Sequence, residues 1–180
     1  GYFPGAKPIA IKLLFSTETR RLLGAQAIGE EGVDKRIDVL ATALKGEMTI
    51  DQIADLELCY APPYGGAKDP VNLAAMVAQN VLDGLSEEAQ WHELEGSDAT
   101  ILDVRDAAER DALSIPGSIH IPLAELRGRL TELSRERPVI VHCASGQRSY
   151  YAVRILKQNG FQAKNLSGAI KTWSMATRSG

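Results

Sequence analysis

Residues 139–156 read VIVHCASGQRSYYAVRIL, and this stretch decides the fold of a chain of 180 residues. It begins with an apolar run, which predicts a buried strand, and ends with apolar residues at helical spacing. Between the two lie Cys143 and a short loop that contains one glycine, Gly146, and one arginine, Arg148. A strand, a loop and a helix in this order are typical of α/β proteins. Cys143 is therefore either a packed thiol at a strand end or a nucleophile in a loop built to hold it.

The composition is that of an ordinary globular protein, with 44% apolar and 24% charged residues. The net charge of -3 gives no electrostatic reason for a nucleic-acid partner, so we expect none. The apolar runs are too short to cross a bilayer, and no segment has the pattern of a signal peptide. The two cysteines, Cys59 and Cys143, lie far apart and have no neighbours at metal-ligand spacing. We therefore expect a cytoplasmic protein without a membrane partner, a metal site or a disulfide framework.

In residues 86–180, short apolar runs typical of strands alternate with longer runs of helical spacing. The predicted strands are 100–104, 139–143 and 163–166, and the predicted helices are 123–133, 148–160 and 168–176. This alternation predicts an α/β domain with a mostly parallel sheet and helices on both faces. In such sheets, sites form at the carboxyl ends of the strands, which is where Cys143 lies.

Residues 1–85 have a different pattern, which predicts a small α+β domain. A hairpin of strands 9–15 and 21–29 is followed by helices at 33–44, 48–58 and 69–84, with the irregular segment YAPPYGGAKDP before the last helix. Thr49 and Asp69 are the expected N-caps of the second and third helices, with Pro70 in the first turn and Gly84 at the stop. The polar residues 82–96 are typical of a linker, so we expect domains 1–85 and 86–180.

The loop after Cys143 has the parts that an activated cysteine needs. The N-terminus of the following helix offers backbone N–H groups and partial positive charge, and Arg148 offers a full charge. Both favour the thiolate, which is the nucleophilic form. Gly146 can adopt the positive φ of a tight loop, and Ser149 either caps the helix or donates a hydrogen bond to the sulfur. Packing as a small hydrophobic side chain is the alternative, but it does not account for these three residues.

The stretches ILDVRDAAE at 101–109, IPGSIHIPL at 115–123 and HCASGQRS at 142–149 occur in this order. Together they resemble a rhodanese domain over about residues 90–176. In rhodaneses the cysteine takes a sulfane sulfur from a donor as a persulfide and passes it to a nucleophilic acceptor. The resemblance implies that Cys143 is catalytic and that the active-site loop consists of Ala144, Ser145, Gly146, Gln147, Arg148 and Ser149.

The length of this loop bears on its chemistry. Related cysteine phosphatases have five residues between the cysteine and the arginine, whereas Cys143 and Arg148 are separated by four. The shorter loop forms a smaller cradle, which favours a sulfur atom over a phosphate group. We therefore do not expect phosphatase activity.

Four further polar residues of this domain are interpreted as structural. In the rhodanese family, residues such as Asp103 and Arg105 tie the end of a strand to neighbouring loops, so we expect an ion pair. His142 precedes Cys143 on a strand and should point to the opposite face, and His120 lies in a turn where a structural hydrogen bond is expected. A thiolate that is already formed needs no general base, so neither histidine is assigned a catalytic role.

In the first domain, LLGAQAIG at 22–29, GVDKRIDVLATAL at 32–44 and YAPPYGGAKDPVN at 60–72 carry a second resemblance. They are similar to the dimerisation domain of pyridine nucleotide-disulfide oxidoreductases, most closely the coenzyme A-disulfide reductase and NADH oxidase branch. Members of that branch bind FAD and NAD in domains that precede this one, and here no G-x-G-x-x-G motif follows a strand. The resemblance implies the C-terminal part of a larger homodimeric flavoenzyme. FAD, NADH and coenzyme A are implied for that parent, and none is expected to be bound by this chain alone.

Tyrosines of the dimerisation domain in that branch reach the partner's coenzyme A and cysteine site. Tyr2 and Tyr60 match these positions best, and Tyr64 lies close by. Aromatic packing in a proline-containing loop is the alternative for Tyr60 and Tyr64. Cys59 stands where the family has a small apolar residue, so we expect it to pack.

Together the resemblances predict sulfur transfer through a persulfide at Cys143, within an FAD- and NADH-dependent reductase of coenzyme A disulfide, persulfide or polysulfide. The implied partners are a sulfane-sulfur donor, a thiol acceptor with coenzyme A persulfide as one candidate, and the FAD and NAD domains of the same enzyme. The alternative is a non-catalytic dimerisation and docking module. An inactive rhodanese would be expected to lose its cysteine or distort its loop, and this sequence retains both.

Overall fold

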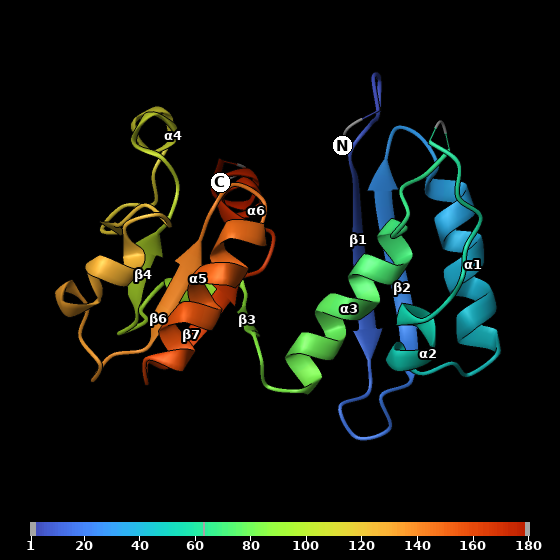
Figure 1. The fold of residues 1–180 in the computed structure, drawn as a ribbon, viewed down its shortest axis with the longest axis horizontal. Helices are drawn as coiled ribbons and strands as arrows, with labels where there is room; N and C mark the ends of the chain where they lie inside the picture. Colours follow the sequence, from blue (N-terminus) through green and yellow to red (C-terminus); the bar gives the residue numbers. More distant parts are fainter. Residues whose placement is uncertain (1–2, 63, 179–180) are drawn as a thin grey trace. The chain divides into compact units, whose positions relative to one another are not determined.

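The computed structural model describes residues 3–62 and 64–178. The chain divides into two compact units, residues 1–83 and residues 84–180, and each is described by itself (Figure 1). The predicted organisation, a small α+β domain followed by an α/β domain with a parallel sheet, is confirmed. Within the described ranges, no helix combines the length and the apolarity that a membrane crossing requires.

The first unit is built on an antiparallel hairpin of β1 (Ile9–Phe15) and β2 (Leu22–Gly29). Along β1 the side chains alternate between half-buried and exposed, because successive residues of a strand point to opposite faces. Ile11, Leu13 and Phe15 pack toward the core of the unit, whereas Leu14 is exposed. The hairpin therefore buries one face against helices.

Three helices form the rest of this unit: α1 (Val33–Lys45), α2 (Ile50–Ala54) and α3 (Pro70–Leu82). Thr49 caps α2 by accepting a hydrogen bond from the Gln52 backbone N–H, and Asp69 caps α3, whose first residue is Pro70. These caps are the ones that the sequence predicts. They satisfy N–H groups that have no partner within the helix.

A buried ion pair holds the irregular segment before α3 against α1. The Arg36 guanidinium donates hydrogen bonds to both carboxylate oxygens of Asp69, at 3.3 and 2.9 Å. It also reaches the carbonyl oxygens of Gly32 and Tyr64, at 3.1 and 3.4 Å. Asn72 donates to three carbonyl groups at the end of α2. The backbone around Tyr64 is thus anchored to the helical core.

The second unit has a five-stranded parallel sheet with the order β3-β7-β6-β4-β5. The strands are β3 (Glu87–Ala89), β4 (Thr100–Asp103), β5 (Ile119–His120), β6 (Val139–His142) and β7 (Ala163–Leu166). The helices are α4 (Ala107–Ala112), α5 (Gln147–Gln158) and α6 (Ala169–Arg178). All four residues of β6 are buried, since this strand is central and both faces of the sheet are covered.

Two apolar clusters cover the faces of this sheet. Val139 and Val141 point toward α5, in a cluster that also contains Cys143. Ile140 points to the opposite face and packs in a cluster with Ile170 of α6. α5 therefore covers the face on which Cys143 lies, and Figure 1 shows this helix lying along β6 and β7.

The predicted helix at 123–133 is wrong. The structure has two 3₁₀ helices instead, η2 (Leu126–Gly128) and η3 (Leu130–Glu132). The buried and partly buried leucines of this segment are spaced by three and four residues, a pattern that successive 3₁₀ turns satisfy as well as an α-helix does. Gly128 in the middle of the segment further disfavours a continuous helix.

Four short elements of the second unit did not follow from the sequence pattern: β3, η1 (Trp91–Leu94), α4 and β5. Each has two to six residues. A period of two or of 3.6 cannot be recognised over such short lengths. β3 and β5 form the edges of the sheet, and α4 supplies a residue of the candidate site.

Candidate active site

Cys143 lies directly after β6 and before α5, at the carboxyl end of the sheet. It is 1% exposed, and its side chain belongs to the cluster under α5. Gly146 is the N-cap of α5 and has a φ of 110° and a ψ of -23°. A side chain is strained at this positive φ, so glycine is the residue that allows the chain to turn from the strand into the helix. The strand, the turn and the helix together fix the position of the sulfur.

Donors converge on the sulfur from the loop and from the first turn of α5. The Gly146 N–H donates to Sγ at 3.1 Å, and the Ser149 hydroxyl lies 3.4 Å from Sγ. That hydroxyl is also 3.0 Å from the Gly146 carbonyl oxygen, and its one proton serves one of these acceptors at a time. Ser149 therefore lies where the sequence predicts it for a bond to the sulfur, while the N-cap position belongs to Gly146.

The environment lowers the pKa of Cys143 below its ordinary value. Burial is the largest effect and by itself raises the pKa, because it disfavours the charged form. The Ser149 hydroxyl and the backbone N–H groups of Ser145, Gly146 and Ser149 act in the opposite sense and together outweigh burial. The thiolate is thus stabilised by oriented dipoles in a site that is almost closed to water.

Arg148 forms a close ion pair that the sequence pattern did not reveal. Its Nη1 and Nη2 atoms lie 2.6 and 2.7 Å from the two carboxylate oxygens of Glu109, and Nη1 lies 3.6 Å from a carboxylate oxygen of Asp106. Glu109 keeps Arg148 fully charged and itself has a pKa lowered to about 2, mainly by the hydrogen bonds from Arg148. The charge that the loop offers to Cys143 is therefore largely compensated by α4.

Asp103, the last residue of β4, forms the expected structural ion pair with Arg105. Arg105 donates to both carboxylate oxygens of Asp103, at 2.9 and 2.6 Å, and to the carbonyl oxygens of Glu109 and Leu113. His120 contacts the Arg105 carbonyl oxygen through Nε2, at 2.8 Å. Burial opposes the charge of Asp103, but the bonds from Arg105 prevail and its pKa is lowered. This network anchors α4, which carries Glu109.

His142 is fully buried, and its Nε2 lies 3.8 Å from a carboxylate oxygen of Asp103. Neither ring nitrogen has a hydrogen-bond partner among the described residues. Burial lowers the pKa of His142 to about 4, so the ring is neutral near pH 7. It lies with Asp103 and away from the α5 cluster, as strand alternation predicts.

Asn165 lies beside the loop and is bonded to Glu88, and the sequence pattern missed both residues. Asn165 Nδ2 lies 3.9 Å from the point that a Cβ atom on Gly146 would occupy, and it donates to Glu88 Oε1 at 3.1 Å. Burial raises the pKa of Glu88 to about 7. The pairing of β3 with β7 brings these residues together, and no sequence spacing signals it.

The expected coenzyme A residues belong to the first unit. Tyr60 and Tyr64 are 59% and 76% exposed, so aromatic packing does not hold either ring. Tyr2 lies outside the described residues. Cys59, expected to pack, is a free and exposed thiol, because the segment around it is irregular and lies at the surface.

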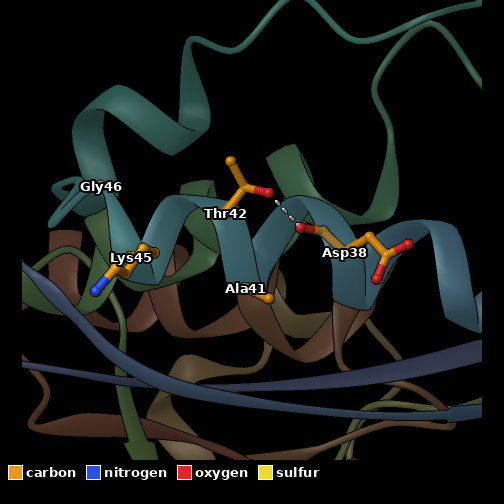
Figure 2. Close-up of a pocket in the computed structure, with 5 residues that line it drawn as sticks. All are labelled: Asp38, Ala41, Thr42, Lys45 and Gly46. Atoms are coloured by element: carbon orange, nitrogen blue, oxygen red, sulfur yellow. Dashed lines mark hydrogen bonds between the residues drawn. The ribbon is translucent and has the colours of Figure 1, made fainter.

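A depression on the first unit is formed by about two turns of α1 and the residue that follows the helix. Figure 2 shows its lining, which consists of Asp38, Ala41, Thr42, Lys45 and Gly46. The Thr42 hydroxyl donates to the Asp38 carbonyl oxygen at 2.8 Å, a bond within the helix. The lining contains no cysteine or histidine, and we assign no chemistry to it.

A parallel sheet covered by helices, whose central strand ends at a buried cysteine with a lowered pKa, defines an α/β protein with a candidate cysteine site. The chain belongs to the rhodanese-like domain family, whose pattern it matches over residues 86–176. Residues 2–69 match the dimerisation domain of pyridine nucleotide-disulphide oxidoreductases. Both recognised families are therefore confirmed.

Two solved structures resemble the chain over nearly its whole length. A reduced CoADR-RHD from Bacillus anthracis is 43% identical and has a TM-score of 0.94, covering 99% of this chain and 33% of that one. A NAD-dependent persulfide reductase from A. fulgidus is 48% identical with a TM-score of 0.86, covering 96% and 31%. The coenzyme A disulfide reductase of Staphylococcus haemolyticus is 46% identical over 81 residues, which are 45% of this chain and 18% of that protein. The chain thus spans about a fifth of the curated relatives' length.

Proposed function

We propose that Cys143 is the catalytic residue of a rhodanese-type sulfurtransferase, which carries a sulfane sulfur as a persulfide. The observation that carries this proposal is the set of donors around the sulfur, which lower the pKa of Cys143. A lowered pKa increases the fraction of thiolate, and the thiolate is the attacking species. The proposed active-site loop comprises Ala144, Ser145, Gly146, Gln147, Arg148 and Ser149.

In the first half-reaction, the Cys143 thiolate attacks the outer sulfur of a donor R–S–SH. An S–S bond forms at Cys143 while the S–S bond of the donor breaks, the thiolate R–S⁻ leaves with that electron pair, and the proton stays on the transferred sulfur. The loop N–H groups that faced the thiolate then face the persulfide. A nucleophilic thiolate acceptor takes the outer sulfur in the second half-reaction and restores the Cys143 thiolate.

The length and charge pairing of the active-site loop favour sulfur transfer over phosphate-ester hydrolysis. Four residues separate Cys143 from Arg148, and Arg148 is engaged by Glu109 at 2.6 and 2.7 Å. A transferring phosphoryl group needs several positive groups directed at its oxygens. A single sulfur atom needs only the donors that already surround Sγ.

We further propose that this reaction belongs to an FAD- and NADH-dependent reductase of coenzyme A disulfide, persulfide or polysulfide. The similarity to the Staphylococcus haemolyticus and A. fulgidus proteins supports this. FAD and NADH would be bound by domains that this chain does not comprise. Domain 1–85 would form the homodimer and present Tyr2, Tyr60 and Tyr64 to coenzyme A, and domain 86–180 would transfer sulfur. The exposure of Tyr60 and Tyr64 fits a role in contacting a ligand.

The test is mass spectrometry of the chain after treatment with inorganic polysulfide. We expect an adduct of one sulfur mass that maps to Cys143, is lost in Cys143→Ala and is retained in the matched variant Cys59→Ala. Both thiols are free, so the second variant controls for non-specific oxidation. An adduct that survives Cys143→Ala, or no adduct, would favour the alternative of a non-catalytic dimerisation and docking module.

A further inference from the structure

The active-site loop has one charged side chain, Arg148, and that charge is already engaged. Glu109 holds both terminal nitrogens of the guanidinium, at 2.6 and 2.7 Å, and Asp106 lies 3.6 Å from one of them. Such a two-point pair is stronger and more fixed in geometry than a single contact. The Arg148 side chain is about one-third exposed, so solvent reaches this ion pair.

Other cations on the α4 side are also occupied. Arg105 is buried against Asp103, and Arg110 donates to the hydroxyl and carbonyl oxygens of Ser118, at 2.9 and 2.8 Å. Arg110 additionally lies 3.7 Å from Asp103. Each of these three arginines on the α4 side of the site thus has an anionic or carbonyl partner. The groups that the described residues direct at the Cys143 sulfur are backbone N–H and hydroxyl dipoles.

Sulfur donors differ in how strongly their reaction with Cys143 depends on an unpaired cation in the site. Thiosulfate reacts as Cys143–S⁻ + S–SO₃²⁻ → Cys143–S–S⁻ + SO₃²⁻, so three negative charges meet in one small volume. A protonated organic persulfide reacts as Cys143–S⁻ + R–S–SH → Cys143–S–SH + R–S⁻, with one negative charge throughout. In a site of low effective dielectric constant, like-charge repulsion is strong unless a cation offsets it.

We propose that Glu109 is a positioning residue that sets donor specificity: by engaging Arg148, it makes the site accept protonated organic persulfides and disfavour the thiosulfate dianion. This inference rests on the proposed persulfide chemistry of Cys143. Arg148 lies in the first turn of α5, next to Ser149, whose hydroxyl lies 3.4 Å from Sγ, so its charge belongs to the segment that surrounds the sulfur. Glu109→Gln keeps an oxygen that can accept from Arg148 and from the Asp106 N–H but removes the negative charge.

The experiment measures persulfide formation at Cys143 in single-turnover reactions of the full chain, with thiosulfate and with the persulfide of 2-mercaptoethanol as donors. We expect Glu109→Gln to raise the second-order rate constant for thiosulfate about tenfold and that for the persulfide less than about twofold. Glu132→Gln is the matched control, because Glu132 forms a similar two-point pair with Arg129, at 2.6 and 2.9 Å, without contacting the loop. It should change neither rate constant.

Two further readouts separate a change of charge from a change of structure. The wild-type reaction with thiosulfate should become faster as salt is added, since salt screens repulsion between like charges, and this dependence should weaken in Glu109→Gln. The double variant Glu109→Gln/Arg148→Gln should lose the gain. An unchanged ratio of the two rate constants in Glu109→Gln, or a gain that persists without Arg148, would overturn the inference. Absence of a Cys143 persulfide with either donor would instead refute the proposed function.

Discussion

Removal of the Ser149 hydroxyl should raise the pKa of the Cys143 thiol and change the pH dependence of its reactions in a defined way. The hydroxyl lies 3.4 Å from Sγ and is the side-chain donor to the sulfur. It is the largest of the effects that oppose burial. The variant Ser149→Ala leaves the backbone N–H donors in place, so it isolates the contribution of one hydrogen bond.

The magnitude follows from the geometry. A hydrogen bond to a charged group contributes roughly 1.5–3 kcal/mol. Because the single proton is shared with the Gly146 carbonyl oxygen at 3.0 Å, the lower end of that range applies. A difference of about 1.4 kcal/mol corresponds to a rise of about one pKa unit. Below both pKa values the thiolate fraction then falls about tenfold.

The more basic thiolate of the variant is also a better nucleophile. With a Brønsted coefficient of about 0.4–0.5, a rise of one pKa unit makes it about threefold more reactive. At low pH, Ser149→Ala should therefore react about three- to fourfold more slowly than the parent, and above both pKa values about threefold faster. The two pH–rate profiles should cross.

The Cys143 thiolate is titrated by its ultraviolet absorbance, and the absorbance of the matching Cys143→Ser variant is subtracted. All proteins carry Cys59→Ser, because Cys59 is an exposed thiol that would also titrate. Persulfide formation is followed across the same pH range. Ser174→Ala is the control, since the Ser174 hydroxyl bonds a carbonyl group of α6 and should not affect the loop. If the pKa of Cys143 in Ser149→Ala does not rise, or if the profiles do not cross, the assignment of Ser149 as a donor to the sulfur is wrong.

Three further predictions concern the surrounding structure. Asp103→Ala should lower the free energy of unfolding, measured in urea, by about 3–5 kcal/mol, because it leaves the buried Arg105 without its carboxylate partner. A loss below about 1 kcal/mol would contradict a stabilising role of this buried ion pair. Gly146→Ala should lower the free energy of unfolding by about 1–2 kcal/mol through backbone strain alone, since the atom nearest to the added Cβ is 3.9 Å away. An unchanged unfolding midpoint would show that the positive φ of residue 146 is not required. The pKa of Glu88 is raised to about 7, so its protonated form stabilises the fold at low pH and this contribution is lost as the pH rises through about 7. Urea titrations at pH 5 and pH 8 should show that the wild type loses about 1–2 kcal/mol more stability over this range than Glu88→Gln does, a figure that allows for the partial exposure of Glu88. Equal losses in the two proteins would contradict burial of the Glu88 carboxyl group.

Much of the fold follows from local patterns. The apolar run of β6, the helical spacing of α5 and the glycine between them predict a strand, a turn and a helix, and all three are present. The caps Thr49 and Asp69 are equally local, since the residues they bond lie two or three positions away. The segment 123–133 shows the limit of this reasoning, because a spacing of three and four residues does not distinguish an α-helix from 3₁₀ turns.

The surroundings of the cysteine depend on contacts that no spacing encodes. Arg148 meets Glu109 across 39 positions of the chain, and Asn165 meets Glu88 across 77. In both cases the partner comes from an element too short to be recognised from its pattern, α4 or β3. The sequence therefore predicts a cationic loop, whereas in the structure the charge of Arg148 is paired with the carboxylate of Glu109.

The sequence by itself determined the position of the nucleophile, the length of its loop and the helix whose N-terminus faces it, because these depend on consecutive residues and on the periods of strands and helices. Only the tertiary structure decided how the charges around Cys143 are paired and which carboxylates are buried. The physical reason is that electrostatic energies depend on distance and on exclusion of water, and both are set by the order of strands in the sheet. That order places β4, which leads into α4, on one side of β6, and β7, which pairs with β3, on the other.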